Sequence, residues 1–184
     1  MLGTKKTNDT LVALRDPDAR ARVVDFETRT AEKFRDRPDH EASATWYEKI
    51  GQFGRLDAAK NAADQFLQAE KYDKAIYWYE VYRNANKDKD TSVLIPLAHS
   101  YAKQDLCPKA AVILKEANSF GSPEEIKDSA RALATLFSQT SVLHDECEEA
   151  DKWISIARQL DADVSISCDN SRSFVGQDCK EISF

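Results

Sequence analysis

Tryptophan-centred segments recur along the chain at intervals typical of helical repeat proteins. Trp78 lies in the segment 71–82 (KYDKAIYWYEVY), and Trp46 and Trp153 lie in similar segments that contain alanine and further aromatic or branched residues. A fourth segment has Ile113 at the matching position, so that the four positions are 32, 35 and 40 residues apart. Self-similarity at such a period predicts an array of helical units, each of which buries its apolar face against the next.

The composition suits an array of helices. Of the 184 residues, 42% are hydrophobic and 32% are charged, which is enough apolar material for one sizeable core or a short solenoid. Glycine and proline occur five times each, as suits long helices joined by short turns. The net charge of −6 argues against nucleic-acid binding, because that requires clustered lysine and arginine. No apolar run approaches the ~20 residues that a membrane helix needs, so we expect no membrane insertion.

Capping residues and prolines predict where eight helices begin and end. The expected helices cover about residues 16–37, 39–51, 57–70, 73–83, 92–104, 105–120, 122–143 and 147–160. Asp16, Asp39 and Asp105 are the predicted N-caps of three of them. The strongest local signal is the segment 122–125 (SPEE). Its serine caps a helix, its proline takes the first helical position and its second glutamate completes a capping box.

Small and large residues recur at matching positions of the predicted helix pairs. In the first helix of three pairs, an alanine is followed three residues later by an aromatic residue. These residues are Ala31 and Phe34, Ala63 and Phe66, and Ala98 and Tyr101, whereas the fourth pair has Ser138 and Ser141. The second helices have Ser43, Ala75, Ala110 and Ala150 at the small position, and Tyr47, Tyr79, Leu114 and Ile154 at the large one. A small residue lets two helices approach closely while the large one fills the space beside it. Trp46, Trp78 and Trp153 are accordingly expected to be equivalent buried residues.

The segment 72–80 (YDKAIYWYE) resembles the second helix of the tetratricopeptide repeat. The segments 46–49 (WYEK) and 78–80 (WYE) resemble the related Sel-like repeat of the same superfamily. The resemblance covers about residues 20–160. It implies an all-α fold, namely a right-handed α-solenoid of about four antiparallel helix pairs. Proteins of these families are interaction scaffolds with unrelated partners, so the resemblance implies protein binding without identifying the partner.

Changes in composition divide the chain into three parts. Residues 1–15 are polar at first and are expected to form a flexible N-terminal segment. Residues 16–161 are the predicted helical repeat domain. Residues 162–184 contain few helix-forming residues but keep several apolar ones. We therefore expect this tail to form an irregular cap over the exposed end of the last helices.

The tetratricopeptide resemblance also implies a binding face. If the first helix of each pair lines the concave surface, nine side chains point into it, and we expect them to contact a protein partner. They are Asp57, Lys60, Asp64, Gln68, Ile95, His99, Lys103, Thr135 and Gln139. The family's clamp for C-terminal carboxylates needs an asparagine beside the lysine, whereas Lys60 is followed by Asp64, so the clamp is not supported. The mixed charges indicate a folded partner or a mixed-charge peptide; the alternative is a solvated face, with binding elsewhere.

The sequence offers no catalytic, cofactor or metal-binding pattern. His40, His99 and His144 fall on different predicted helices, so no nucleophile–base pair can be proposed. The acidic run 145–149 is interpreted as the first turn of a helix, where negative charge is favoured, and not as a cation site. We therefore expect a non-catalytic adaptor or scaffold without a cofactor. The alternative is a bacterial immunity or inhibitor protein that binds and blocks a secreted toxin or effector, and an enzyme is the third option. The oligomeric state is not predicted.

The four cysteines lack the spacing of a C-x-x-C metal site. Cys107 and Cys147 occupy equivalent positions, which the resembling families place about 8–10 Å apart, too far for a disulfide. Cys168 and Cys179 are the expected disulfide pair, because a polar loop joins them; the alternative is four free thiols. A disulfide persists only in an oxidising compartment. We thus expect a periplasmic or secreted protein whose signal peptide is missing from this sequence, with a cytoplasmic protein as the alternative.

Overall fold

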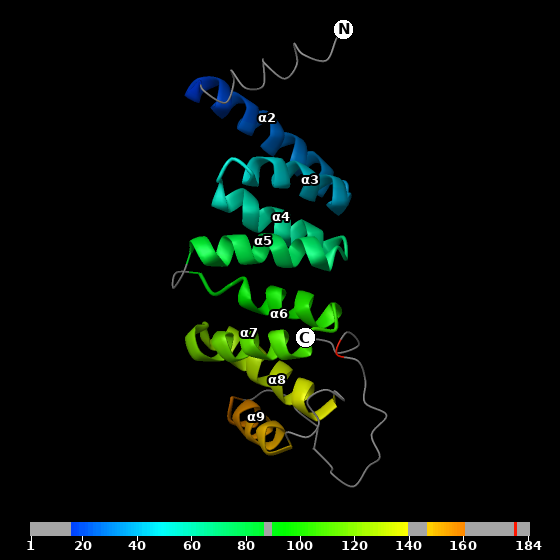
Figure 1. Ribbon diagram of the computed structural model, residues 1–184, viewed down its shortest axis with the longest axis vertical. Coiled ribbons are helices and arrows are strands. Elements are labelled where there is room, and N and C mark those ends of the chain that lie inside the picture. The colour runs from blue at the N-terminus through cyan, green and yellow to red at the C-terminus, as the bar shows by residue number, and fades with distance from the viewer. Residues whose placement is uncertain (1–15, 87–89, 140–146, 161–178, 180–184) are drawn as a thin grey trace. The chain divides into compact units, whose positions relative to one another are not determined.

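The computed structural model describes residues 16–86, 90–139, 147–160 and 179. Its regular elements in these ranges are eight helices and no strand, which confirms the predicted all-α class (Figure 1). The predicted flexible segment 1–15 lies outside the described residues, as does the predicted tail apart from Cys179. The chain divides into two compact units, Met1–Ala69 and Glu70–Phe184, so the predicted repeat domain spans both.

The first unit contains three described helices. They are α2 (Pro17–Arg35), α3 (His40–Gly51) and α4 (Leu56–Gln68). Helix α3 packs against both α2 and α4 (Figure 1). The predicted caps are confirmed, since the Asp16 carboxylate accepts the N–H of Asp18 at 3.0 Å and the Asp39 carboxylate accepts the N–H of Ala42 at 3.1 Å.

Helices α2 and α3 approach each other at small residues. The Ser43 hydroxyl donates to the backbone carbonyl of Ala31 at 2.9 Å, and both residues are fully buried. On α4, Ala62, Ala63 and Phe66 are likewise fully buried. The small positions therefore let the backbones come close, as the alternation of small and large residues predicted.

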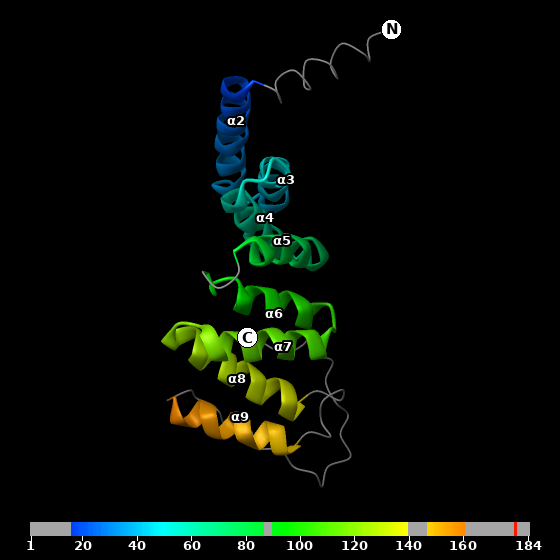
Figure 2. The same cartoon turned by 60° about the vertical axis from the view of Figure 1, so that its left-hand side comes forward.

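The second unit contains the remaining five described helices. They are α5 (Tyr72–Ala85), α6 (Leu94–Lys103), α7 (Cys107–Phe120), α8 (Pro123–Gln139) and α9 (Cys147–Gln159). Each helix packs against the next in the chain, so that the five follow one another in order (Figure 2). The Tyr101 hydroxyl of α6 donates to the Glu80 carboxylate of α5 at 3.0 Å. The Asn118 amide of α7 donates to the carbonyl of Ile126 on α8, also at 3.0 Å.

Side chains one repeat apart also contact each other in the second unit. The Arg83 guanidinium of α5 donates to both carboxylate oxygens of Glu116 on α7, 33 residues further on. The Lys115 ammonium of α7 lies 2.8 Å from the Glu149 carboxylate of α9, and these two residues are 34 positions apart. The hydrogen bond from Lys115 lowers the pKa of Glu149, and it outweighs burial, which alone would raise that pKa. Side chains of alternate helices in this unit therefore contact each other at the period that the sequence shows.

The turns that precede two helices repeat the same geometry. Glu70 and Asp105 both have a φ of 57°, in the left-handed region. Each stands two residues before a helix, at Tyr72 and Cys107 respectively. They are 35 positions apart, the same step as between Trp78 and Ile113.

Two predicted helix starts are corrected. Asp105 is not the N-cap of α7, whose cap residue is Leu106. Asp105 instead ends α6 in the left-handed conformation, and the N–H of Leu106 bonds back to the carbonyl of Tyr101 at 2.9 Å. Helix α6 begins at Leu94, two residues later than predicted. The Asp90 carboxylate accepts the N–H of Ser92 at 3.0 Å and holds a local turn there.

The predicted burial of the small and large positions in the second helices is confirmed at all eight of them. Ser43, Ala75, Ala110, Ala150, Tyr47, Tyr79, Leu114 and Ile154 are all buried. Trp78 and Trp153 are buried as well, at 3% and 6% exposure. Trp46, in contrast, is only half-buried. Its ring is covered by Phe26, which packs edge-on and is itself 63% exposed, and by the Lys49 ammonium, which lies 3.7 Å from the ring centroid. The three tryptophans are therefore not equivalent.

We expect Trp78→Ala to lower the free energy of unfolding by about 3–5 kcal/mol, because it empties a large buried site. Trp46→Ala should cost markedly less, because that ring already contacts water. Urea denaturation followed by far-ultraviolet circular dichroism measures both. Equal costs for the two substitutions would contradict the difference in burial.

The predicted capping box is present at the start of α8. The Ser122 hydroxyl oxygen accepts the N–H of Glu125 at 3.4 Å, and the Glu125 carboxylate accepts the N–H of Ser122 at 2.7 Å. The Thr91 hydroxyl donates to the same carboxylate at 2.8 Å. Burial alone would raise the pKa of Glu125. The hydrogen bonds outweigh burial and hold this pKa below its ordinary value of 4.5.

A lowered pKa in the folded state means that the ionised Glu125 stabilises the fold above pH 4.5, and that this contribution is lost as the pH falls through the folded-state pKa. Glu125→Gln should therefore cost about 0.5–1 kcal/mol near pH 7, and the cost should vanish in acid. Chemical denaturation at several pH values measures it, with Glu124→Gln on the exposed side of the same turn as the control. A cost that does not change with pH would contradict the role of the charge.

Candidate functional site

The predicted binding residues on α4 are engaged in local ion pairs. Asp57 lies 2.7 Å from the Arg55 guanidinium, whose hydrogen bond is the main cause that lowers the pKa of Asp57. The Lys60 ammonium lies 3.1 Å from the Asp64 carboxylate one helical turn away. Gln68, the fourth predicted residue, is exposed at the end of the helix. This face of α4 thus presents paired charges.

The predicted residues on α6 lie in one row. Ile95, His99 and Lys103 are spaced four residues apart and are all half-buried. The ring of Tyr72, on α5, lies 6.2 Å from that of His99. Burial is the main cause that lowers the pKa of His99 below its ordinary value of 6.5, and the nearby Lys103 adds to it. The row therefore combines an uncharged imidazole at neutral pH with one lysine and one apolar side chain.

The two predicted residues on α8 are Thr135 and Gln139. The Thr135 hydroxyl donates to the carbonyl of Arg131 in its own helix at 3.0 Å. The side chain of Gln139 lies outside the described residues. The α4 residues belong to the first unit and the α6 and α8 residues to the second. The single groove of nine residues therefore stays a prediction.

The structure reveals an apolar surface on α7 that sequence reasoning missed. A hollow of about 260 Å³ lies there, and its lining residues are Tyr101, Pro108, Lys109, Val112 and Ile113. Val112 is 62% exposed at its edge. Tyr77 of α5, which is 60% exposed, occupies the matching repeat position, because each of the two residues directly precedes a buried repeat residue. An apolar residue at a position that the repeat turns toward solvent was the signal that could have identified this surface.

A disulfide joins Cys107, the first residue of α7, to Cys179. Their Cα atoms are 5.8 Å apart and both residues are fully buried. The predicted bond between Cys168 and Cys179 is therefore wrong, since Cys179 is bonded to another residue 72 positions away. The prediction failed because it paired neighbours in the sequence, whereas Cys179 lies at the start of α7, 72 positions from its partner. Cys168 lies outside the described residues.

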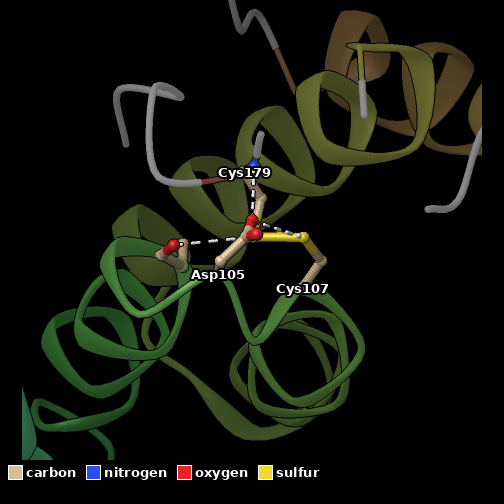
Figure 3. Close-up of a disulfide and its surroundings, with 4 residues drawn as sticks. Asp105, Cys107 and Cys179 are labelled. Carbon is tan, nitrogen blue, oxygen red and sulfur yellow. Dashed lines mark hydrogen bonds between the residues drawn. A yellow bond between two sulfur atoms is a disulfide. The ribbon is translucent and has the colours of Figure 1, made fainter. Parts of the chain in front are cut away.

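Asp105 holds the partner of this bond in place. Its carboxylate accepts the backbone N–H of Cys179 at 3.1 Å (Figure 3). The same carboxylate oxygen lies 3.8 Å from Sγ of Cys107, and Sγ of Cys179 lies 3.5 Å from the carbonyl oxygen of Ala102. The residue that ends α6 in the left-handed conformation, Asp105, thus also holds Cys179 at the α6–α7 turn.

Compared with protein-family models and with curated proteins, the chain matches no family and no individual protein. Among the helices of the described ranges, none combines the length and apolar character required to cross a membrane.

We expect non-reducing peptide mapping to recover a peptide that links Cys107 to Cys179. Cys179→Ser should lower the free energy of unfolding by up to about 4 kcal/mol, because it opens a loop of 72 residues. Cys168→Ser is the matched control and should leave both the linked peptide and the stability unchanged. A peptide that links Cys168 to Cys179 instead would contradict the structure.

Proposed function

We propose that the chain is a non-catalytic protein-binding module, an adaptor or scaffold, in which α5–α9 belong to a right-handed helical-repeat solenoid. Three observations support this. Side chains 33 and 34 residues apart pair between alternate helices. The positions that the repeat predicts to be small or large in the second helices are buried in each of them. The left-handed turns recur 35 residues apart. Arrays of this kind offer extended surfaces to other proteins.

The binding surface that we propose is formed by Tyr77, on α5, and Val112, on α7, together with the hollow beside Val112. The observation that carries the proposal is the exposure of Tyr77 and Val112, at 60% and 62%, at matching repeat positions. Single exposed apolar side chains are common, but here two occur at the same repeat position of two helices that Arg83 and Glu116 tie together. Lys109 lines the same hollow, and its ammonium lies 5.5 Å from the centroid of the Tyr101 ring. The surface thus suits a protein segment with an apolar side chain that enters the hollow and an acidic group beside it.

The disulfide supports the location expected from the sequence, with a different partner for Cys179. The bond between Cys107 and Cys179 is buried, and such bonds are maintained in oxidising compartments. We therefore propose a periplasmic or secreted protein. The thiol state of protein taken from its native host separates this location from the cytoplasmic alternative.

The test is affinity capture from the native host with the immobilised chain, followed by mass spectrometry and a direct affinity measurement on the captured protein. Tyr77→Ser/Val112→Ser should weaken binding at least tenfold. Val23→Ser/Phe26→Ser, which removes exposed apolar groups from the first unit, should leave the affinity unchanged. A folded partner bound very tightly at its active site would indicate an inhibitor, and modest affinity for short segments would indicate an adaptor.

A third variant, His99→Ala/Lys103→Ala, tests the row on α6 that the sequence predicted. Loss of binding in this variant, with unchanged binding in Tyr77→Ser/Val112→Ser, would overturn the surface proposed on α5 and α7. A chain that retains no protein specifically would contradict the proposed function as a whole. Circular dichroism of each variant separates lost contacts from lost folding.

A further inference from the structure

Three potential metal ligands converge at the turn between α6 and α7. The ligand atoms are a carboxylate oxygen of Asp105 and the Sγ atoms of Cys107 and Cys179, and all lie within 4.8 Å of one another (Figure 3). Both cysteines are fully buried, whereas Asp105 is exposed. Water therefore reaches the cluster at Asp105. In the oxidised chain the two sulfur atoms are bonded to each other, so neither is available as a thiolate ligand.

We infer that the reduced chain binds a thiophilic divalent cation, Zn²⁺, through Asp105, Cys107 and Cys179. Zinc prefers four ligands in a tetrahedron, with Zn–S distances of about 2.3 Å and Zn–O distances of about 2.0–2.2 Å. These lengths place neighbouring ligand atoms about 3.3–3.8 Å apart. Once the S–S bond is broken, the two sulfur atoms can separate to that spacing within the present cluster. Water on the exposed side of Asp105 supplies the fourth ligand.

The surroundings of the cluster suit a bound cation. The backbone N–H of Cys179 donates to the Asp105 carboxylate at 3.1 Å, and a hydrogen bond of this kind orients a carboxylate ligand. Cys107 is the first residue of α7, where the positive end of the helix dipole favours a thiolate. The position of Asp105 is set by the turn that ends α6, so the oxygen ligand does not depend on the disulfide.

The conversion between the disulfide and the zinc-bound pair of thiolates conserves atoms and electrons. A thiol or phosphine reductant supplies two electrons, the S–S bond breaks, and two protons from solvent give two thiols. Zinc then displaces both thiol protons and is held by two thiolates and one carboxylate. Oxidation runs in the opposite direction: two electrons pass to the oxidant, the disulfide forms again and zinc is released. Residue 179 is thus tied to the start of α7 by a covalent bond in one state and by the metal in the other.

The experiment uses the full chain carrying Cys147→Ser/Cys168→Ser, so that only Cys107 and Cys179 remain. The protein is reduced anaerobically with a phosphine, freed of reductant and titrated with Zn²⁺ in competition with a chromophoric chelator. We expect one zinc per reduced chain and none per oxidised chain. Titration with Co²⁺ should give the intense near-ultraviolet absorption of cobalt–thiolate bonds. Absence of stoichiometric zinc binding, or of this absorption, would overturn the site.

Asp105→Asn tests the oxygen ligand, because the amide oxygen still accepts the N–H of Cys179 but carries no charge. This variant should bind zinc about tenfold to a hundredfold more weakly. Asp151→Asn, which removes an equal charge from the exposed side of α9, should bind like the parent. Equal affinity in Asp105→Asn would remove Asp105 from the site. If reduction unfolds the second unit, zinc should restore its helical circular dichroism, and failure to do so would equally contradict the inference.

Discussion

The close approach of neighbouring helices at small residues is the constraint on which the rest of the structure depends. Ala75, Ala110 and Ala150 are fully buried at matching positions, and Ser43 at the fourth matching position donates its hydroxyl proton directly to the backbone of α2. A larger side chain at any of these positions would separate two backbones and displace the large residue packed beside it. Once the small face of a helix is buried, the orientation of its other side chains is fixed as well.

That orientation determines the two features on which the functional proposals rest: the exposed apolar residues of α5 and α7, and the buried cysteine at the start of α7. Tyr77 and Val112 directly precede buried repeat residues, so the helix turns them toward solvent on α5 and α7. At the start of α7 the opposite holds, because Cys107 faces inward and is fully buried three residues before Ala110. Its sulfur is therefore bonded to Cys179 at the α6–α7 turn, where Asp105 accepts the N–H of Cys179. The repeat thus determines which apolar groups are exposed and which thiol is bonded.

Features that depend on short stretches of chain were predictable from the sequence. The caps at Asp16 and Asp39 and the capping box at the start of α8 each follow from residues within one helical turn. The burial of the second-helix positions follows from the recurrence of small and large residues along the chain. The disulfide partner of Cys179 was not predictable, because it depends on the path of more than seventy residues. The role of Asp105 was also missed, since an aspartate between two helices can cap the second or end the first. Of the predicted binding residues, Ile95, His99 and Lys103 lie together on α6. The exposed apolar positions were not predicted, because the repeat pattern identifies the residues that its helices bury.

The central claim is that side chains of alternate helices in the second unit contact each other one repeat apart. The most direct test is zero-length cross-linking with a carbodiimide, which joins a lysine to a carboxylate only when the two are in contact, followed by peptide mass spectrometry. The structure predicts an amide bond between Lys115 and Glu149, whose charged groups lie 2.8 Å apart across 34 residues of sequence. A cross-linked set that contains only neighbours within one helix, such as Lys60 with Asp64 or Lys152 with Glu149, would contradict the repeat arrangement.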